Sequence, residues 1–188
     1  DNGEVIGTTM TSEYSEATEY LCDDPTPKLY GGFGTSFNFY NFDISAAFTY
    51  SIGGLTYDSG YASYMSPPGG TVGSNFHRDV LKAWTPENKD SDVPRFVYQD
   101  QNINASSDRF LVPASYLNFH NAQIGYTIPS KITGRIKVDR VRVYVACDNI
   151  WYWSYRHGLD PRSSFSGGTN YASNSPVRTI TGGINITF

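Results

Sequence analysis

Hydrophobic and polar residues alternate along residues 42–52 more regularly than anywhere else in the chain. One parity holds Phe42, Ile44, Ala46, Phe48, Tyr50 and Ile52, and the other holds Asp43, Ser45, Ala47, Thr49 and Ser51. A period of two over this length predicts a β-strand with one apolar and one polar face. Residues 29–40 repeat the pattern, and residues 41–42 leave room for only a short turn between the two strands.

Three further strands are predicted, over residues 116–128, 140–153 and 177–188. In the first of them the apolar residues change parity near residues 120–122, which indicates a β-bulge. A tight basic connection, residues 129–139, joins this strand to the next. In the last strand one face carries Ile180, Ile184, Ile186 and Phe188, opposite Thr181, Gly183, Asn185 and Thr187.

The connections between these strands differ greatly in length. Residues 1–27 are polar and acidic and are predicted to be loop, residues 56–108 form a long irregular loop, and residues 155–176 form a second polar loop. Strands of about 9–11 residues with short turns at one end and long loops at the other are typical of outer-membrane β-barrels. Soluble antiparallel sheets also alternate, so the asymmetry of the connections carries the prediction.

Composition agrees with an all-β chain that has long polar loops. Charged residues make up 17% and aromatic residues 15%, with Tyr 15, Phe 11 and Gly 18; a globular domain has roughly 25% charged residues. The net charge of −4 and the scattered Lys and Arg residues argue against nucleic-acid binding. No segment suits a membrane helix, so contact with a membrane would require a closed barrel. The first twenty residues lack signal-peptide regions, so we expect a mature product or a piece of a longer polypeptide.

Aromatic residues provide the candidate sites. Trp151 and Trp153 share the parity of the apolar face and are expected in an aromatic girdle at the membrane interface. Candidate contacts with a sugar substrate or a partner are the loop aromatics Tyr57, Tyr61, Tyr64, Trp84 and Tyr171; packing between loops is the plain alternative. The ending on Ile184, Ile186 and Phe188 resembles the signal by which bacterial outer-membrane barrels are recognised for assembly.

Sequence motifs for catalysis and for metal binding are weak in this chain. The sequence His77–Asp79 resembles a kinase catalytic loop but lacks the Asn and the Gly-rich loop that should accompany it. Asp100, Asn102 and Asn104 resemble the start of a calcium loop, yet the required Gly and Glu are missing. We therefore expect no enzyme activity and no cofactor, with calcium in the loops as an open alternative. Cys22 and Cys147 are not expected to form a disulfide.

Four sequence blocks resemble the SusC/RagA family of TonB-dependent outer-membrane transporters from Bacteroidetes. They are "PKLYGGFGTSFNFYNFDISAAFTYSIGG", "AWTPENKDSDVPRF", "SDRFLVPASYLNFHNAQIGYTIP" and "VRVYVACDNIWYWSYRHGLDP", in family order from Pro27 towards the end of the chain. Three departures stand out: Arg162 replaces the usual Glu after "DP", Cys147 replaces a small or polar residue, and two residues rather than one separate Tyr155 from Gly158.

This resemblance implies a 22-stranded antiparallel transmembrane β-barrel with an N-terminal plug. Residues 28–188 would supply about five C-terminal strands, paired with the remaining barrel strands because unpaired edges are costly in lipid. The implied function is TonB-dependent uptake of oligosaccharides (glycans) or peptides across the bacterial outer membrane, beneath a SusD-like lipoprotein lid and driven by TonB–ExbBD. A dimer of transporter–lid pairs is also implied. The loops would face the lid, and the basic turn with Lys131, Arg135 and Lys137 would face the periplasm.

Two other classes of protein would also produce alternating strands. A soluble β-sandwich could bind carbohydrate through exposed Tyr and Trp side chains, and a secreted all-β enzyme could have the same composition. Dependence on detergent separates the transporter from both alternatives.

Overall fold

The computed structural model describes residues 11, 13–66, 73, 75–98, 100, 102, 105–156, 158–163 and 175–188. The chain divides into two compact units, one made of Asp1–Asp23 and Asp58–Leu111 and the other of Asp24–Tyr57 and Val112–Phe188. The predicted candidate Tyr171 and the calcium-loop residue Asn104 lie outside the described residues. Among those described, no helix is long and apolar enough to cross a membrane.

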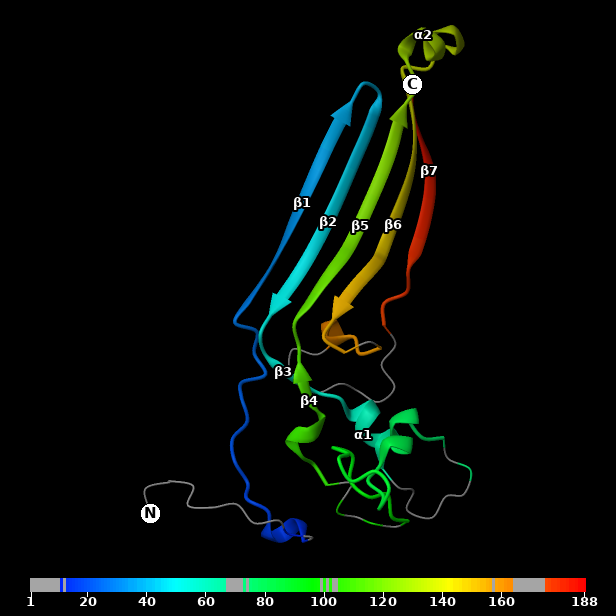
Figure 1. The fold of residues 1–188 in the computed structure, drawn as a ribbon. Helices are drawn as coiled ribbons and strands as arrows, with labels where there is room; N and C mark the ends of the chain where they lie inside the picture. The colour runs from blue at the N-terminus through cyan, green and yellow to red at the C-terminus, as the bar shows by residue number, and fades with distance from the viewer. Residues whose placement is uncertain are drawn as a thin grey trace. The chain divides into compact units, whose positions relative to one another are not determined.

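An antiparallel sheet of five strands dominates the second unit (Figure 1). Its order is β1-β2-β5-β6-β7, formed by β1 (Leu29–Phe39), β2 (Phe42–Ile52), β5 (Tyr116–Thr127), β6 (Arg140–Ser154) and β7 (Thr179–Thr187). These are the five strands that the alternation predicts, so the all-β assignment is confirmed. The strands β1 and β7 form the two edges of this sheet, which is open.

Short connections lie at one end of the sheet. The β1–β2 hairpin closes through Tyr40, whose φ of 50° is left-handed, next to the pair Phe39↔Phe42. Between β5 and β6 the chain forms α2 (Ser130–Thr133) and η4 (Gly134–Ile136) and then a left-handed residue, Lys137. The predicted tight basic connection is therefore a compact helical turn.

Two short strands were not predicted. β3 (Leu55–Tyr57) pairs with β4 (Leu111–Pro113) in a separate two-stranded sheet. Nearby, Ala114 N–H donates to the Gly54 carbonyl at 2.9 Å. Residues 55–57 alternate too briefly to be distinguished from loop by periodicity, and residues 111–113 contain a proline. A single turn, η5 (Pro161–Ser163), follows β6.

The other unit is built from short helices, η1 (Tyr14–Glu16), α1 (Ser59–Met65), η2 (Arg78–Lys82) and η3 (Asp108–Phe110). The Asp58 carboxylate caps α1 by accepting from Tyr61 N–H at 2.9 Å. Phe110, only 2% exposed, is buried together with Ala62 and Met65. The Tyr20 hydroxyl donates to Asp108, and the Tyr14 hydroxyl donates to the Ser106 carbonyl at 3.1 Å. The N-terminal segment is thus attached to the end of the long loop.

Candidate functional site

An apolar face covers one side of the five-stranded sheet. The register aligns Phe33 with Phe48, Phe48 with Phe119, and Phe119 with Trp151, so one aromatic row crosses four strands. The rings of Phe33 and Phe48 stack at 5.0 Å, and those of Phe48 and Phe119 at 4.5 Å. The outer side chains of this row are largely exposed, Phe33 to 56% and Trp151 to 53%, and Phe48 and Phe119 between them are half-buried. An exposed aromatic row of this length indicates a surface that lies against something apolar.

Aromatic rows lie at both ends of this face. At the end with the short turns, Phe42 is paired with Phe39 and with Tyr126. At the loop end, Tyr50 and Leu117 align with Trp153. Between them the face carries small and aliphatic residues, Ala46, Ala122, Cys147, Ile44, Ile124 and Val145. Phe42 and Tyr50 are eight residues apart, about 26 Å along a strand. At the strand tilt of about 35–45° this is roughly 20 Å of height, close to the apolar band of about 25 Å on a transmembrane barrel.

A β-bulge keeps this face continuous. His120 is the residue without a partner between the pairs Ala47↔Asn121 and Phe48↔Phe119. On the other side of β5 the ladder shifts at the same place, where Asn149 of β6 has a left-handed φ of 51°. The predicted bulge at residues 120–122 is confirmed. Because of it, aromatic side chains on both sides of the parity change point to the same face.

The opposite face is polar and carries an ion pair that crosses three strands. Arg142 of β6 donates to Asp43 of β2 through Nε, at 2.9 Å, and through a second N–H. Between them, on β5, lies Gly125, which is paired with Asp43 on one side and with Tyr144, two residues from Arg142, on the other. A Cβ atom on Gly125 would lie 2.6 Å from the Asp43 carboxylate oxygens. Glycine therefore leaves the space through which the guanidinium reaches its partner.

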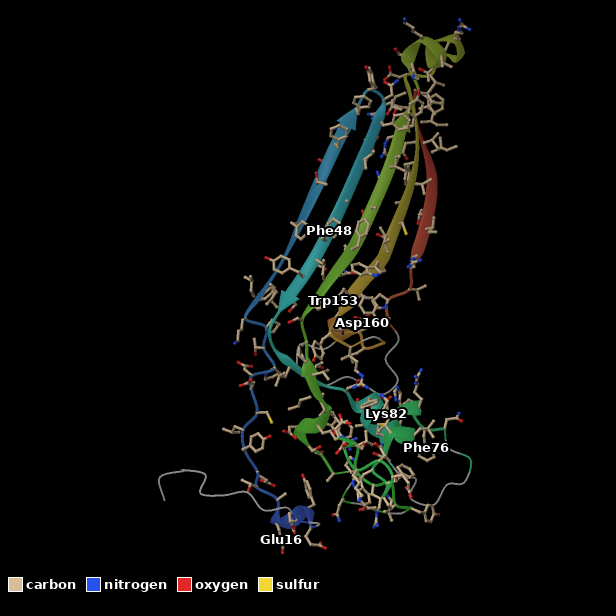
Figure 2. All side chains as sticks on the ribbon, in the orientation of Figure 1. Glu16, Phe48, Phe76, Lys82, Trp153 and Asp160 are labelled. Atoms are coloured by element: carbon tan, nitrogen blue, oxygen red, sulfur yellow. The ribbon has the colours of Figure 1, made fainter. Side chains whose placement is uncertain are left out.

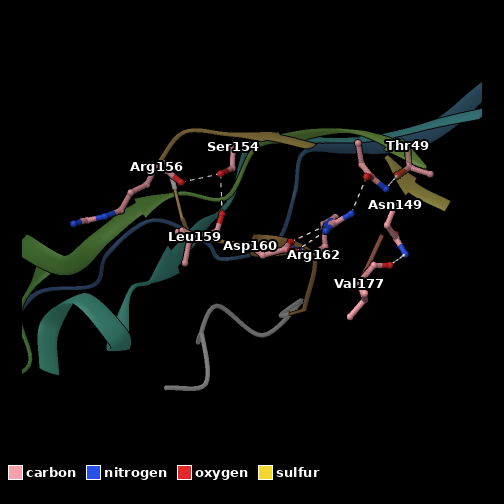
Figure 3. A network of polar contacts seen from close by, with 9 residues as sticks. Thr49, Asn149, Ser154, Arg156, Leu159, Asp160, Arg162 and Val177 are labelled. Atoms are coloured by element: carbon pink, nitrogen blue, oxygen red, sulfur yellow. Dashed lines mark hydrogen bonds and ion pairs between the residues drawn. The ribbon is translucent and has the colours of Figure 1, made fainter. Parts of the chain in front are cut away.

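At the loop end of the polar face, Arg162 joins the loop after β6 to the sheet (Figure 3). Its guanidinium donates to both carboxylate oxygens of Asp160, at 2.8 and 2.6 Å, and to the Asn118 side-chain oxygen at 2.7 Å. The Asn118 amide in turn donates to the Thr49 hydroxyl at 3.2 Å. Arg162 also lies over the Tyr152 ring at 4.6 Å. Thr49, Asn118 and Tyr152 form one row across β2, β5 and β6, so the arginine is held against the sheet.

Burial and the nearby charge have opposite effects on the pKa of Asp160. Burial raises the pKa of the Asp160 carboxyl, but hydrogen bonds from the Arg162 side chain and backbone, together with its charge, outweigh burial and lower that pKa overall. The hydrogen bond to Asp160 likewise raises the pKa of Arg162. The Arg162 and Asp160 side chains are 11% and 7% exposed, so their ion pair is largely shielded from water.

The loop bearing this pair is shaped by its own hydrogen bonds. The Ser154 hydroxyl lies 2.9 Å from the Arg156 carbonyl oxygen and 2.8 Å from that of Leu159. Leu159 and Pro161 are buried. Together these contacts turn the chain back after β6, so that Arg162 lies on the polar face. Figure 2 places Asp160 just beyond Trp153 at the end of β6.

The predicted site residues are distributed over both units. Tyr61 and Tyr64 belong to α1, and Trp84 follows η2. The Tyr61 ring meets the His77 ring edge-on at 4.8 Å, and its hydroxyl lies 3.2 Å from Asp79 Oδ2; these contacts fit the packing alternative. Tyr57 ends β3. Whether these residues contact a substrate or lid stays a prediction.

Trp151, Trp153, Ile184 and Ile186 lie on the apolar face, as the alternation predicts. Phe188 follows the end of β7 and is 90% exposed. Their roles in a girdle and in barrel assembly stay predictions. In the part of the chain that the structure describes, no three His, Cys, Asp or Glu residues gather in a metal-binding group. Cys22 and Cys147 are free.

No protein-family model matches the chain. A curated protein from Formosa agariphila, TonB-dependent receptor P3, is 31% identical over 186 residues, which cover 94% of this chain and 18% of the receptor. TonB-dependent receptor P26 of the same organism is 27% identical over 175 residues, or 87% of this chain and 17% of that receptor. The chain thus spans less than a fifth of these curated relatives.

Solved structures give the same comparison. The RagAB peptide importer in the open-open state superposes with a TM-score of 0.79 at 25% identity, over 98% of this chain and 20% of the importer chain. A structure of the RagAB peptide transporter superposes with a TM-score of 0.76 at 27% identity, over 95% of this chain and 19% of that chain. Both likenesses extend over nearly the whole chain.

Proposed function

Since the chain belongs to the SusC/RagA-like TonB-dependent transporters of the bacterial outer membrane, we propose that it supplies five neighbouring strands of a transport barrel. The observation that carries this proposal is the sheet with two faces. Its apolar face, bordered by aromatic rows, suits lipid, and its polar face with the Arg142–Asp43 and Arg162–Asp160 pairs suits a water-filled lumen. The edges β1 and β7 pair with the other strands of the barrel.

The transporter takes up oligosaccharides, energised by TonB–ExbBD and covered by a SusD-like surface lipoprotein. Transporter–lid pairs assemble as dimers. Aromatic side chains in the loops, such as Tyr64 and Trp84, which are 43% and 36% exposed, offer flat faces for sugar rings. Peptides are the second candidate substrate, because the solved relatives are described as a peptide importer and transporter.

Growth of strains that differ only in this transporter tests the proposal. A strain lacking the full gene should lose growth on an oligosaccharide mixture as sole carbon source and keep growth on the monosaccharides. A variant without the TonB box, the periplasmic segment of this family of transporters that TonB would engage, should fail in the same way, because substrate binding without an energy source does not lead to transport. Loss of growth on a peptide mixture alone would establish the second candidate. Normal growth of both strains on both mixtures would contradict uptake.

A lipoprotein partner is tested separately. Affinity purification of the full-length transporter in detergent should yield a SusD-like lipoprotein in equal amount. Cross-links from the long loop, residues 56–108, would support a lid at the loop end of the sheet. Cross-links only from the α2 turn would contradict this orientation.

A further inference from the structure

Strand β6 extends beyond its neighbour β7 at the loop end. The β6–β7 ladder ends at the pair Asp148↔Thr179, whereas β6 stays paired with β5 as far as Ser154↔Tyr116. We call the space beside residues 149–154 of β6 the notch; its described neighbours on the side of β7 include Pro176 and Arg178.

A cavity of about 740 Å³ lies along this notch. It is bordered by consecutive residues of β6 and by the segment before β7, which includes Pro176 and Arg178. Two contacts hold this segment in place: Arg178 donates to the Ile150 carbonyl at 2.6 Å, and the Asn149 amide donates to the Val177 carbonyl at 3.2 Å. Figure 3 shows the second of them. Because backbone groups of alternate strand residues point to the same edge, Tyr152 N–H faces the notch as the Ile150 carbonyl does.

The charge of the lining favours an anion. Arg162 and Arg178 border the cavity, and its described lining includes no Asp or Glu side chain. Arg162 is already bound to Asp160 and Asn118. Arg178 is exposed and uses one of its N–H groups on Ile150. A guanidinium has five N–H donors and binds phosphate or carboxylate through two at once.

The position of the two tryptophans indicates where the anion comes from. Trp151 and Trp153 border the same cavity and lie on the apolar face, in the aromatic rows at the loop end. They are 53% and 52% exposed. Tryptophan favours the level of the lipid headgroups because its ring is apolar and its N–H is polar. The cavity is thus bordered from both faces of the sheet: the two indole rings lie on the apolar face, whereas Tyr152 and Arg162 lie on the polar face.

We propose that this notch binds the phosphate-bearing headgroup of a lipid in the outer leaflet. Arg178 binds the phosphate, Tyr152 N–H adds a donor, and Trp151 and Trp153 pack against the sugar or the upper acyl chain. A membrane lipid is the occupant rather than a soluble nutrient because both indole rings lie on the apolar face. This site depends on the outer-membrane location of the chain and not on which nutrient is transported.

Lipid binding to the full-length transporter in neutral detergent tests this site. Native mass spectrometry would measure the binding of diphosphorylated lipid A to the wild type and to R178Q, which removes the positive charge. The matched control is R140Q, which removes the same charge from the opposite end of β6. We expect R178Q to bind at least about tenfold more weakly, as for the loss of one charge-assisted hydrogen bond. R140Q should bind like the wild type, and R178K should recover part of the affinity.

Three results would overturn the proposal. One is equal binding by the wild type and R178Q, and another is an equal loss in R140Q. The third is displacement of lipid A by millimolar inorganic phosphate, which would make the notch a site for a free anion. Heat-modifiable gel migration reports whether each variant is folded. If R178Q does not fold, W153L provides the same comparison, because loss of the indole ring should weaken lipid A and leave inorganic phosphate unaffected.

Discussion

Arg142 of β6 and Asp43 of β2 form a two-point ion pair although strand β5 lies between them. The contact passes over Gly125, whose missing side chain leaves the required space. On the other side, the Arg142 guanidinium lies 5.1 Å from the centre of the Tyr144 ring. That ring covers Gly183 on β7, where a Cβ atom would lie 2.6 Å from it. Two glycines thus allow long side chains to connect four strands on the polar face.

The first prediction concerns Gly125. G125A should destabilise the full-length transporter by about 2 kcal/mol, in the range of mutations that break a partly buried ion pair or overpack a site. The added methyl group collides with the Asp43 carboxylate, and the Arg142 guanidinium must move away. The measurement is the urea midpoint for loss of heat-modifiable migration in detergent.

Gly182 provides the control. A Cβ atom there would meet only the Tyr144 carbonyl oxygen, at 3.9 Å. G182A should therefore leave the midpoint unchanged or raise it slightly, since alanine restricts the unfolded chain more than glycine does. If both variants lowered the midpoint equally, the space at Gly125 would have no special role.

Local patterns predicted the strands, whereas contacts between distant residues could not be predicted. Alternation over residues 42–52 and the parity change near His120 are properties of consecutive residues, so the strands and the bulge could be predicted from the sequence. Asp43 and Arg142 are 99 positions apart, and their contact depends on the order of three strands. Nothing in the sequence near Gly125 shows which side chains cross it.

In the sequence, Arg162 stood out only because it replaces the Glu that usually follows "DP" in this family. Its role depends on a turn of the loop after β6, set by the Ser154 hydroxyl and the carbonyls of Arg156 and Leu159. Alternation carries no information about such a loop. Its one local signal is the pair Asp160 and Arg162, two residues apart and of opposite charge.

The second prediction is a strong coupling between Asp160 and Arg162. D160N and R162Q should each cost about 3 kcal/mol, because each leaves a shielded charge without its partner. The double variant should cost less than the sum of the two, with a coupling of about 2 kcal/mol. The measurement is a double-mutant cycle of urea midpoints on the full-length transporter.

The matched control for this cycle is the ion pair between Asp79 and Lys82, which are joined at 2.9 Å and are 22% and 66% exposed. Water screens such a pair, so the cycle of D79N and K82Q should give a coupling below about 1 kcal/mol. Equal couplings in the two cycles would contradict the shielding of Asp160 and Arg162.

The third prediction concerns how the contribution of Asp160 to stability changes at acid pH. The pKa of Asp160 is lowered in the folded protein from its usual value of 3.8. The carboxylate therefore adds to stability at every pH above 3.8, and this contribution is lost as the pH falls below 3.8 through the folded-state pKa. The difference in urea midpoint between the wild type and D160N should be constant from pH 7 to about pH 5 and shrink below about pH 4. A difference that stayed constant to pH 3 would show that Arg162 does not hold Asp160 ionised.

The fourth prediction tests which face of the sheet meets lipid. Ile124 and Gln123 are neighbours on β5, but Ile124 lies in the middle of the apolar face and Gln123 on the polar face beside Ser45 and Ala146. I124R should destabilise the barrel by about 2–4 kcal/mol, as for an arginine near the bilayer midplane. Q123R should change stability by less than about 1 kcal/mol, since its charge remains in a polar lumen near Asp43. Urea titrations of the full-length protein in lipid vesicles measure both. The reverse order would place lipid on the polar face, and equal small effects in both variants would mean that neither face is embedded.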